Sequence, residues 1–269
     1  MAGAGNDFIV IDGRNAGFKS IARSFLRKVC TRSLSVGADG VIVILPSRAA
    51  DFKVRFYNPD GSISRFCGNG SRCASMYAHL NGLAKKKLSF EGDDGIHHAI
   101  VSGKNVSVSI ADIKRLKAPI TVTAAKRIWR GGLIDVGVPH FVTEVANIED
   151  LDVEILGRKL RHHKRFFPAG ANVDFIRCEK NGSVTIRTYE RGVERETLSC
   201  GSGCVAASVY VALMKNYRSP IIFHTRSSVH LKVSFEEYEG RVQGFFLEGD
   251  ARIIFKGDLH GDALSGFSL

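Results

Sequence analysis

Two short motifs of the form Cys-Gly-polar-Gly are the residues of this chain best suited to chemistry. The first begins at Cys67 and the second at Cys200, and small and apolar residues follow each. A cysteine at a helix start lies near the positive end of the helix dipole, which favours thiolate. The glycines leave backbone N–H groups open to a carboxylate. Two such motifs could remove and return the proton on the carbon beside a carboxylate, which would invert a stereocentre.

Cysteine has other common uses, and each gives a competing interpretation. The other four cysteines are Cys30, Cys73, Cys178 and Cys204. They are predicted to be free thiols that pack as small hydrophobic side chains. The spacings 67/73 and 200/204 are wider than the usual Cys-x-x-Cys of zinc sites, so no metal is expected. A redox dithiol would need the same close spacing. For one motif alone burial would be the better interpretation, but the matched pair favours catalysis.

The motifs must be positioned by regular elements, and four helices are predicted. Two follow the motifs, over 71–80 and 203–214, and the first should end at Asn81-Gly82. The second is apolar on nearly all faces, so it should be buried all round. Apolar residues at helical spacing predict two more helices, over 21–29 and 155–160. Runs rich in Val, Ile and Phe predict strands at 8–12, 40–45, 53–57, 106–110, 173–177, 184–189, 221–225, 230–235 and 253–255.

The two halves of the chain resemble one another. The two motif cysteines are 133 residues apart, and a tyrosine segment precedes each at a similar distance, from Tyr57 and from Tyr189. Residues 6–9 also resemble 172–176. This pattern predicts an internal duplication, in which each half is a strand-rich unit around a buried helix that begins at a cysteine. The boundary is expected near Lys117, where 115–119 has the composition of a linker.

Composition limits the class of protein. The chain has 269 residues, 44% hydrophobic and 24% charged, which is typical of a globular protein of one large or two medium domains. Its net charge of +11 favours anionic partners, either nucleic acid or small carboxylates and phosphates. The longest apolar stretch is too short to cross a membrane, and the first residues lack a basic leader. A cytoplasmic enzyme with free cysteines is therefore expected.

Five longer motifs make the chain recognisable. They are GAGNDFIVID at 3–12, FYNPDGSISRFCGNGSRC at 56–73, GVPHFV at 137–142, ANVDFI at 171–176 and YERGVERETLSCGSGC at 189–204. Together they resemble the diaminopimelate epimerase family and span the chain. The resemblance implies a cofactor-independent, two-base epimerase that converts LL-2,6-diaminopimelate to the meso form used for lysine and peptidoglycan.

The resemblance also implies a fold and an assembly. The fold is α+β, with two pseudo-symmetric domains, 1–117 and 118–257, each a strand-rich, barrel-like sheet around a central helix. A C-terminal strand, about 258–269, is expected to return to the first domain. Members of the family are usually homodimers, so a homodimer is expected here.

The same motif matches assign the site residue by residue. Cys67 and Cys200 are implied to be the two catalytic acid/base residues. The N–H groups implied to hold the carboxylate at the reacting carbon belong to Gly68, Asn69, Gly201 and Ser202. The rest of the substrate is assigned to the amides of Asn6, Asn58 and Asn172, to Arg191 at the distal carboxylate, and to Glu190 at an ammonium group. His140 and Glu190 are implied to tune the pKa values of the thiols.

Two features depart from the family pattern. Val138 stands where many members have an Asn that helps to hold the distal end of the substrate, and valine cannot form that hydrogen bond. Looser or different distal recognition is therefore expected. In addition, Met1 and Ala2 leave no room for the short strand that usually precedes the first motif, so a truncated or reassigned start is expected.

Three other functions compete with that of a cofactor-independent diaminopimelate epimerase. A related cofactor-independent racemase could act on proline or glutamate, although Arg191 and three amides favour a substrate with a polar distal end. The basic runs 85–87 and 161–165 lack the interleaved aromatic residues of single-strand binders, so they predict solvated surface rather than a nucleic-acid site. A racemase that uses pyridoxal phosphate would need a Schiff-base lysine, and no lysine has a recognisable context.

Overall fold

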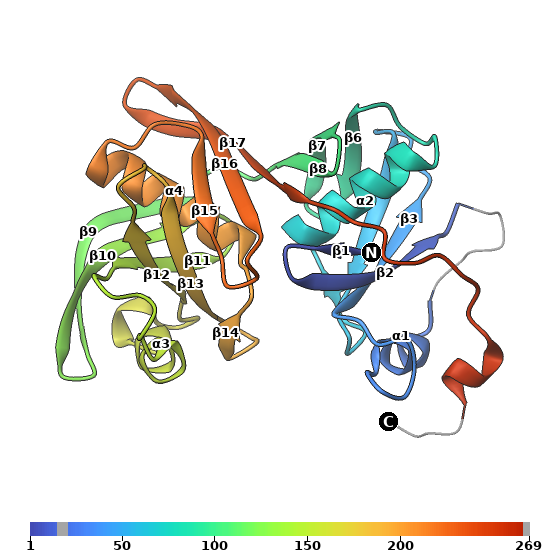
Figure 1. The fold of residues 1–269 in the computed structure, drawn as a ribbon, viewed down its shortest axis with the longest axis horizontal. Coiled ribbons are helices and arrows are strands. Elements are labelled where there is room, and N and C mark those ends of the chain that lie inside the picture. Colours follow the sequence, from blue (N-terminus) through green and yellow to red (C-terminus); the bar gives the residue numbers. More distant parts are fainter. Residues whose placement is uncertain (15–20, 266–269) are drawn as a thin grey trace. The chain divides into compact units, whose positions relative to one another are not determined.

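The computed structural model of the protein describes residues 1–14 and 21–265. The chain divides into two compact units, and each is described by itself. The first unit is Met1–Val108 together with Gly249–Leu269, and the second is Ser109–Glu248. In the part of the chain that the structure describes, each unit combines a large sheet with two α-helices (Figure 1). The predicted α+β class is therefore confirmed.

The sheet of the first unit has the order β1, β2, β3, β4, β6, β7, β8. Its strands are β1 Ala2–Gly3, β2 Asn6–Asp12, β3 Gly40–Leu45, β4 Phe52–Tyr57, β6 Lys87–Gly92, β7 Gly95–Ser102 and β8 Asn105–Ser109. The short β5, Ile63–Ser64, pairs with the end of β4. The pairs β2–β3 and β4–β6 are parallel, and the other pairs are antiparallel.

Helix α2, Gly68–Leu80, is the central element of the first unit. It contacts β1, β2, β3, β4 and β7, so the sheet curves around it. Helix α1, Arg23–Cys30, covers the other face of the sheet. Strand β3 is buried on both faces, because Ile42 and Ile44 pack in the cluster around α2 while Val41 and Val43 pack with α1. This is why β3 is a continuous apolar run rather than an alternating one.

The second unit repeats this arrangement with nine strands. They are β9 Arg115–Ala124, β10 Arg127–Asp135, β11 Pro139–Glu144, β12 Asn172–Cys178, β13 Val184–Glu190, β14 Arg195–Thr197, β15 Ile221–His224, β16 His230–Tyr238 and β17 Arg241–Asp250. Helix α4, Gly201–Lys215, contacts β10, β11, β12 and β16, and α3, Val153–Arg161, packs on β12, β13 and β14. Every residue of α4 from Gly203 to Val211 is buried, which confirms the prediction from its apolar faces.

The strand pairings make the internal duplication explicit. In the first unit β2–β3 is parallel, β3–β4 antiparallel, β4–β6 parallel and β6–β7–β8 antiparallel. In the second unit β11, β12, β13, β15, β16 and β17 pair in the same sequence of directions. Strand β2 therefore corresponds to β11, and β3 to β12.

This correspondence corrects one sequence match. Residues 6–9 lie in β2, whereas 172–176 lie in β12, which is the counterpart of β3. Phe8 pairs with Gly40 just as Phe141 pairs with Val173, so Asn172 occupies the place of Asp39. The two segments look alike because both begin strands of a parallel pair, and local sequence does not specify which strand of the pair it belongs to.

Four other expectations differ from the structure. The predicted linker 115–119 lies in β9, where a bulge between the paired residues Ile120–Gly131 and Lys117–Leu133 accommodates Pro119. Residues 253–255 form no strand. Residues 258–265 include a 3-10 turn, Gly261–Leu264, instead of a strand, and 266–269 lie outside the described residues. Finally, β1 pairs with β2 through a turn at Ala4 and Gly5, so there is room for the short strand.

Candidate active site

Cys67 is the residue that caps the N-terminus of α2. Its backbone is extended, with φ −144° and ψ 109°, and its Sγ accepts a hydrogen bond from the backbone N–H of Gly70 at 3.4 Å. A helix leaves its first N–H groups without partners in the helix, so Cys67 lies where an anion would bind. A Cβ on Gly70 would lie 2.9 Å from the Phe56 ring, so glycine is required for this close approach of α2 to β4. The helix starts at Gly68, three residues earlier than predicted.

A chain of side-chain hydrogen bonds holds Asn69 beside this cysteine. Its Nδ2 donates to Oδ1 of Asn6 at 2.7 Å, and Nδ2 of Asn6 donates to Asp39 at 2.9 Å. On the other side, the buried guanidinium of Arg72 donates to Oδ1 of Asn69 at 2.6 Å. These contacts fix the direction of both amides. The sequence motifs predicted Asn6 and Asn69 as site residues but gave no indication of Asp39 or Arg72.

Asn58 has a different setting in the first unit. It is exposed in the turn after β4, where its Nδ2 donates to Oγ of Ser62 at 2.9 Å and its carbonyl accepts from Gly61. The structure therefore gives it a turn role and does not join it to the network of Asn6 and Asn69. Cys73, on α2, is fully buried, and burial raises its pKa to about 12, as expected for a structural thiol.

Cys200 occupies the N-cap position of α4 in the second unit, as Cys67 does in α2, and its backbone is likewise extended, with φ −127° and ψ 110°. It is 7% exposed, and its Sγ lies 3.4 Å from Oγ of Ser202. Burial, followed by the negative charges of Glu190 and Asp174, raises its pKa well above the ordinary value of a thiol. A thiolate at this position therefore needs nearby positive charge or hydrogen-bond donors.

A buried polar cluster lies next to Cys200. Nδ1 of His140 is 2.7 Å from Asp174, and Nε2 of His140 is 3.0 Å from Oγ of Ser202 and 3.2 Å from Nδ2 of Asn172. Asp174 also accepts from Oγ1 of Thr188 at 2.7 Å. His140 and Asp174 are 0% exposed. Asp174 and Thr188 were not predicted from the sequence, although a charged residue inside the apolar strand 172–178 is a signal for Asp174.

The segment after β13 brings two more predicted residues to this cluster. The backbone N–H of Arg191 donates to Oδ1 of Asn172 at 2.7 Å. Burial raises the pKa of Glu190. Val138 precedes β11, and its carbonyl accepts from the N–H of Val136 at 3.3 Å. Each unit thus has one group of predicted residues: Cys67, Gly68, Asn69 and Asn6 in the first, and His140, Asn172, Glu190, Arg191, Cys200, Gly201 and Ser202 in the second.

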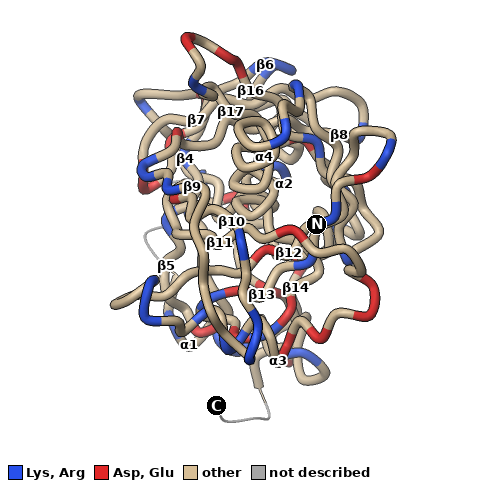
Figure 2. Tube along the Cα trace, turned by 90° about the vertical axis from the view of Figure 1, so that its left-hand side faces the viewer, with Lys and Arg blue, Asp and Glu red and all other residues tan. Residues whose placement is uncertain are grey.

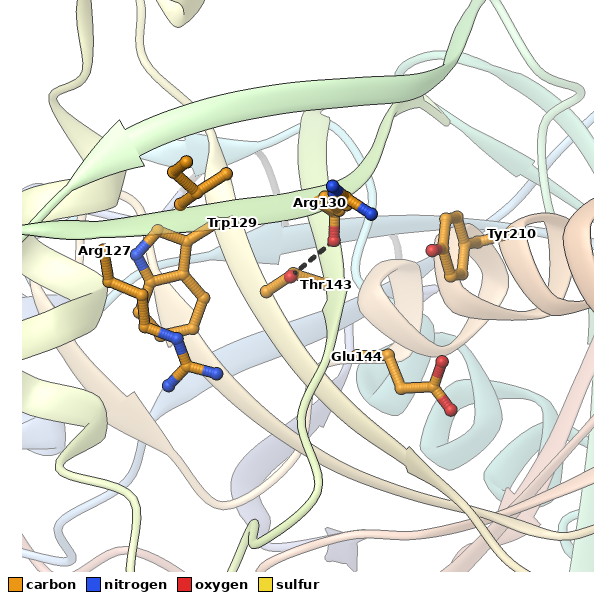
Figure 3. Close-up of a pocket in the computed structure, with 7 residues that line it drawn as sticks. Arg127, Trp129, Arg130, Thr143, Glu144 and Tyr210 are labelled. Atoms are coloured by element: carbon orange, nitrogen blue, oxygen red, sulfur yellow. Dashed lines mark hydrogen bonds between the residues drawn. The ribbon is translucent and has the colours of Figure 1, made fainter.

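Other candidate sites are weaker. Within residues 1–14 and 21–265, no group of three or more His, Cys, Asp or Glu side chains could hold a metal ion. A pocket of about 430 Å³ in the second unit is lined by Arg127, Trp129, Arg130, Thr143, Glu144 and Tyr210, with Ile128 beside them (Figure 3). None of the predicted site residues lines it. The Arg127 guanidinium stacks 4.4 Å from the Trp129 ring centre.

The basic residues are distributed over many strands and loops and are interspersed with acidic ones (Figure 2). Part of the run 161–165 has structural contacts, because Arg161 pairs with Glu194 at 3.0 Å and Arg165 donates to the carbonyl of Thr121 at 2.7 Å. Among the described residues, none of the helices has the length and apolar character needed to cross a membrane.

Comparison with known proteins identifies the family to which this chain is similar. The family model for diaminopimelate epimerase matches residues 1–114 and 132–253. The chain is 40% identical to the diaminopimelate epimerase of a Hydrogenobaculum species, with 96% of each chain covered. It is 38% identical to the diaminopimelate epimerase of Aquifex aeolicus, with 98% of each covered.

Solved structures with low sequence identity share the fold. A probable proline racemase from Agrobacterium radiobacter matches all of this chain over 95% of its own length, with a TM-score of 0.69 and 15% identity. A phenazine biosynthesis protein of the PhzF family from Bacillus anthracis covers 86% of each chain, with a TM-score of 0.67 and 14% identity. The fold is therefore shared among proteins that differ in name and sequence.

Proposed function

The chain belongs to the diaminopimelate epimerase family and is an isomerase; on that premise we propose that it interconverts LL- and meso-2,6-diaminopimelate by proton transfer between two cysteines, without a cofactor. The observation that carries the proposal is the equivalent placement of Cys67 and Cys200. Each occupies the N-cap position of the central helix of its unit, and a glycine and then a polar residue follow each. A thiol at the start of each central helix supplies the acid and the base that a two-base inversion needs.

The proposed chemistry uses one thiol as base and the other as acid. One cysteine removes the proton from the α-carbon, and the other delivers a proton to the opposite face. The N–H groups of Gly68, Asn69, Gly201 and Ser202 hold the adjacent carboxylate and stabilise the charge that develops there. Such stabilisation is needed because an amino-acid α-proton is far less acidic than a thiol. The helix N-termini at both motifs support this role.

Polar residues of both units are assigned to the rest of the substrate. Arg191 binds the distal carboxylate and Glu190 an ammonium group of the substrate, and Asn6, Asn58 and Asn172 bind it through their amides. Val138 removes one amide from the distal end, which favours a broader substrate range than that of a site with asparagine there. A cytoplasmic homodimer that serves lysine and peptidoglycan synthesis remains a prediction from the sequence.

A stereochemical assay tests the proposal. The purified protein is incubated with LL-diaminopimelate, glutamate and proline in parallel, without added cofactor and with a thiol reductant, and the stereoisomers are separated. We expect the meso isomer to form from LL-diaminopimelate and the variants Cys67→Ala and Cys200→Ala to form none. Cys178→Ala, which removes a cysteine outside both motifs, is the matched control and should retain activity. Inversion of glutamate or proline alone would contradict the proposed substrate.

A further inference from the structure

Two histidines of the second unit lie side by side, outside both cysteine motifs. His224 is the last residue of β15 and His230 is the first of β16, and the two are directly opposite one another in the antiparallel pair of strands (Figure 1). Their Nδ1 atoms are 3.0 Å apart, and their rings are nearly perpendicular, at 89°. The proposed epimerase mechanism uses neither residue. Imidazole nitrogen is the commonest metal ligand in proteins, so the pair has the chemistry of a metal site.

The hydrogen bonds of Ser183 fix the protonation of His224. The backbone N–H of Ser183 donates to the side-chain oxygen of Asn181 at 3.0 Å, and the Ser183 hydroxyl donates to the same oxygen at 2.7 Å. Since a hydroxyl has one proton to donate, its oxygen accepts the hydrogen bond of 2.9 Å from Nε2 of His224. Nε2 therefore carries the proton of neutral His224, and Nδ1 keeps a lone pair on the side of His230.

We propose that His224 and His230 form a binding site for a divalent transition-metal ion of the class of Ni²⁺ or Cu²⁺. The ion bonds to both Nδ1 atoms, so two nitrogen–metal bonds form and two bonds from the ion to water break. The Nδ1 proton of the exposed His230 passes to water as Nε2 of the same ring gains one, and no net proton is released. Water completes the coordination, because residues 1–14 and 21–265 contain no group of three or more His, Cys, Asp or Glu that could hold a metal ion.

The distances between the two rings fit one ion with its ligands near a right angle. Bonds of about 2.0–2.1 Å from a metal to two nitrogens 3.0 Å apart enclose an angle of about 95°. An ion on the line from each ring centre through its Nδ1 would place the two ring centres about 4.7 Å apart, and they are 4.6 Å apart. Ligands at about 90° are typical of tetragonal Cu²⁺ and Ni²⁺, whereas tetrahedral Zn²⁺ needs the nitrogens about 3.4 Å apart.

The backbone and Ser183 hold the two ligands in place before an ion arrives. His224 and His230 are the last pair of the ladder between β15 and β16. The turn that joins them is closed by Oγ1 of Thr225, which donates to the carbonyl of Val229 at 2.9 Å. Ser183 orients the His224 ring through Nε2, as the second hydrogen bond of a metal-bound histidine commonly does. Ordered ligands lose little conformational freedom on binding, so this arrangement favours the metal-bound state.

Chemical modification of single histidines tests the site. The full-length protein, without an added histidine tag, is titrated with Ni²⁺ and treated briefly with diethyl pyrocarbonate, which modifies imidazole nitrogen. Trypsin cleaves after Arg226 and places His224 and His230 on separate peptides, so mass spectrometry measures each one. We expect Ni²⁺ to protect both over the same range of concentration. His260, which is exposed and lies outside the pair, should stay reactive in that range.

Three variants distinguish one shared ion from separate binding at each histidine. His230→Gln should raise the Ni²⁺ concentration that protects His224 by about tenfold or more, because one of the two protein ligands is lost. Ser183→Ala should raise it by about 10–100-fold, the usual effect of removing the hydrogen bond that orients a metal-bound histidine. His260→Gln removes an exposed histidine elsewhere and is the matched control, with no change expected.

Several results would overturn the metal site. Unchanged protection of His224 in His230→Gln would show that the two histidines bind separately, and protection of neither would show that no ion binds. The wild-type titration is decisive even where a variant fails to fold, because protection of the two residues over different ranges excludes a shared ion. The measurement needs neither substrate nor the motif cysteines, so its outcome is independent of the proposed epimerase activity.

Discussion

At the scale of single residues, the two duplicated cysteines have different electrostatic settings. The residue two positions after Cys67 is Asn69, which is held by the buried cation of Arg72. The residue two positions after Cys200 is Ser202, which contacts the buried His140, and His140 in turn contacts the carboxylate of Asp174. The backbone site is therefore duplicated while its charges are not. Because the two faces of a substrate carbon are not equivalent, such a difference suits an enzyme that must handle two stereoisomers.

The proposed distal role of Arg191 predicts a specific loss. Arg191→Lys replaces a planar guanidinium, which can bind a carboxylate through two hydrogen bonds, by a single ammonium group. A hydrogen bond to a charged group is worth about 1.5–3 kcal/mol, so kcat/KM for diaminopimelate should fall about tenfold or more. The measurement is the initial rate of epimerisation over a range of substrate concentrations. Arg195→Lys, at an exposed position in β14, is the control, and equal values for both variants would refute the distal role.

Glu190 predicts a pH-dependent cost in stability. Burial raises its pKa in the native state, so the folded protein favours the protonated form more than the unfolded chain does. Its stabilising contribution is full below the unfolded pKa, about 4.3, and is lost as the pH rises through the higher native value. Glu190→Gln should therefore raise the free energy of unfolding at neutral pH and leave it unchanged near pH 4. Urea titrations at the two pH values measure this, and an equal gain at both would contradict the burial argument.

At the scale of elements, the sequence predicted the two central helices and eight of the strands that the structure describes, four in each unit. Their apolar runs are long and their caps clear, as in 40–45 and at Asn81-Gly82. Strands β1, β5 and β14 were missed because they have only two or three residues. Strands β6, β7, β9, β10, β11 and β17 were missed because their runs of Val, Ile and Phe are short or interrupted and their pairing depends on sheet neighbours. The prediction of a linker at 115–119 was wrong because the sequence does not reveal the bulge that accommodates Pro119 in a strand. Asp174 was missed for a similar reason, since its partners lie on other strands.

The start of α4 predicts the effect of one added methyl group. Gly203→Ala would place a Cβ 2.5 Å from Oδ1 of Asp174 and 3.3 Å from Oγ1 of Thr188, so the carboxylate or the helix must shift. Overpacking of this kind costs about 1–3 kcal/mol of unfolding free energy, and it should also disturb the cap at Cys200. Gly257→Ala, where a Cβ meets nothing within 4 Å, is the control. Chemical denaturation of both variants measures the loss of unfolding free energy. Equal stability of the two variants would show that α4 accommodates the added methyl group without loss of stability.

At the scale of the whole molecule, duplication provides two copies of a helix that begins with a thiol. In the proposed mechanism one copy alone supplies an acid or a base, but inversion needs a proton removed from one face of the carbon and another delivered to the other face. The matched strand pairings of the two units explain how one ancestral pattern supplies both groups. The chemistry is therefore expected of the complete chain and not of either unit alone.

The two-base mechanism predicts where solvent hydrogen appears. The proton that reaches the product comes from the second cysteine, which equilibrates with water, so in D₂O the inverted carbon should carry deuterium from the first turnover. Unreacted substrate should stay mostly protonated at early times. A single base that served both faces would instead return some original hydrogen to the product. NMR or mass spectrometry of the separated isomers at low conversion distinguishes the two mechanisms.

The same mechanism predicts that Cys67→Ala and Cys200→Ala each abolish inversion. Any residual exchange of the α-hydrogen should favour opposite stereoisomers in the two variants, because each variant keeps the thiol that reaches only one face of the carbon.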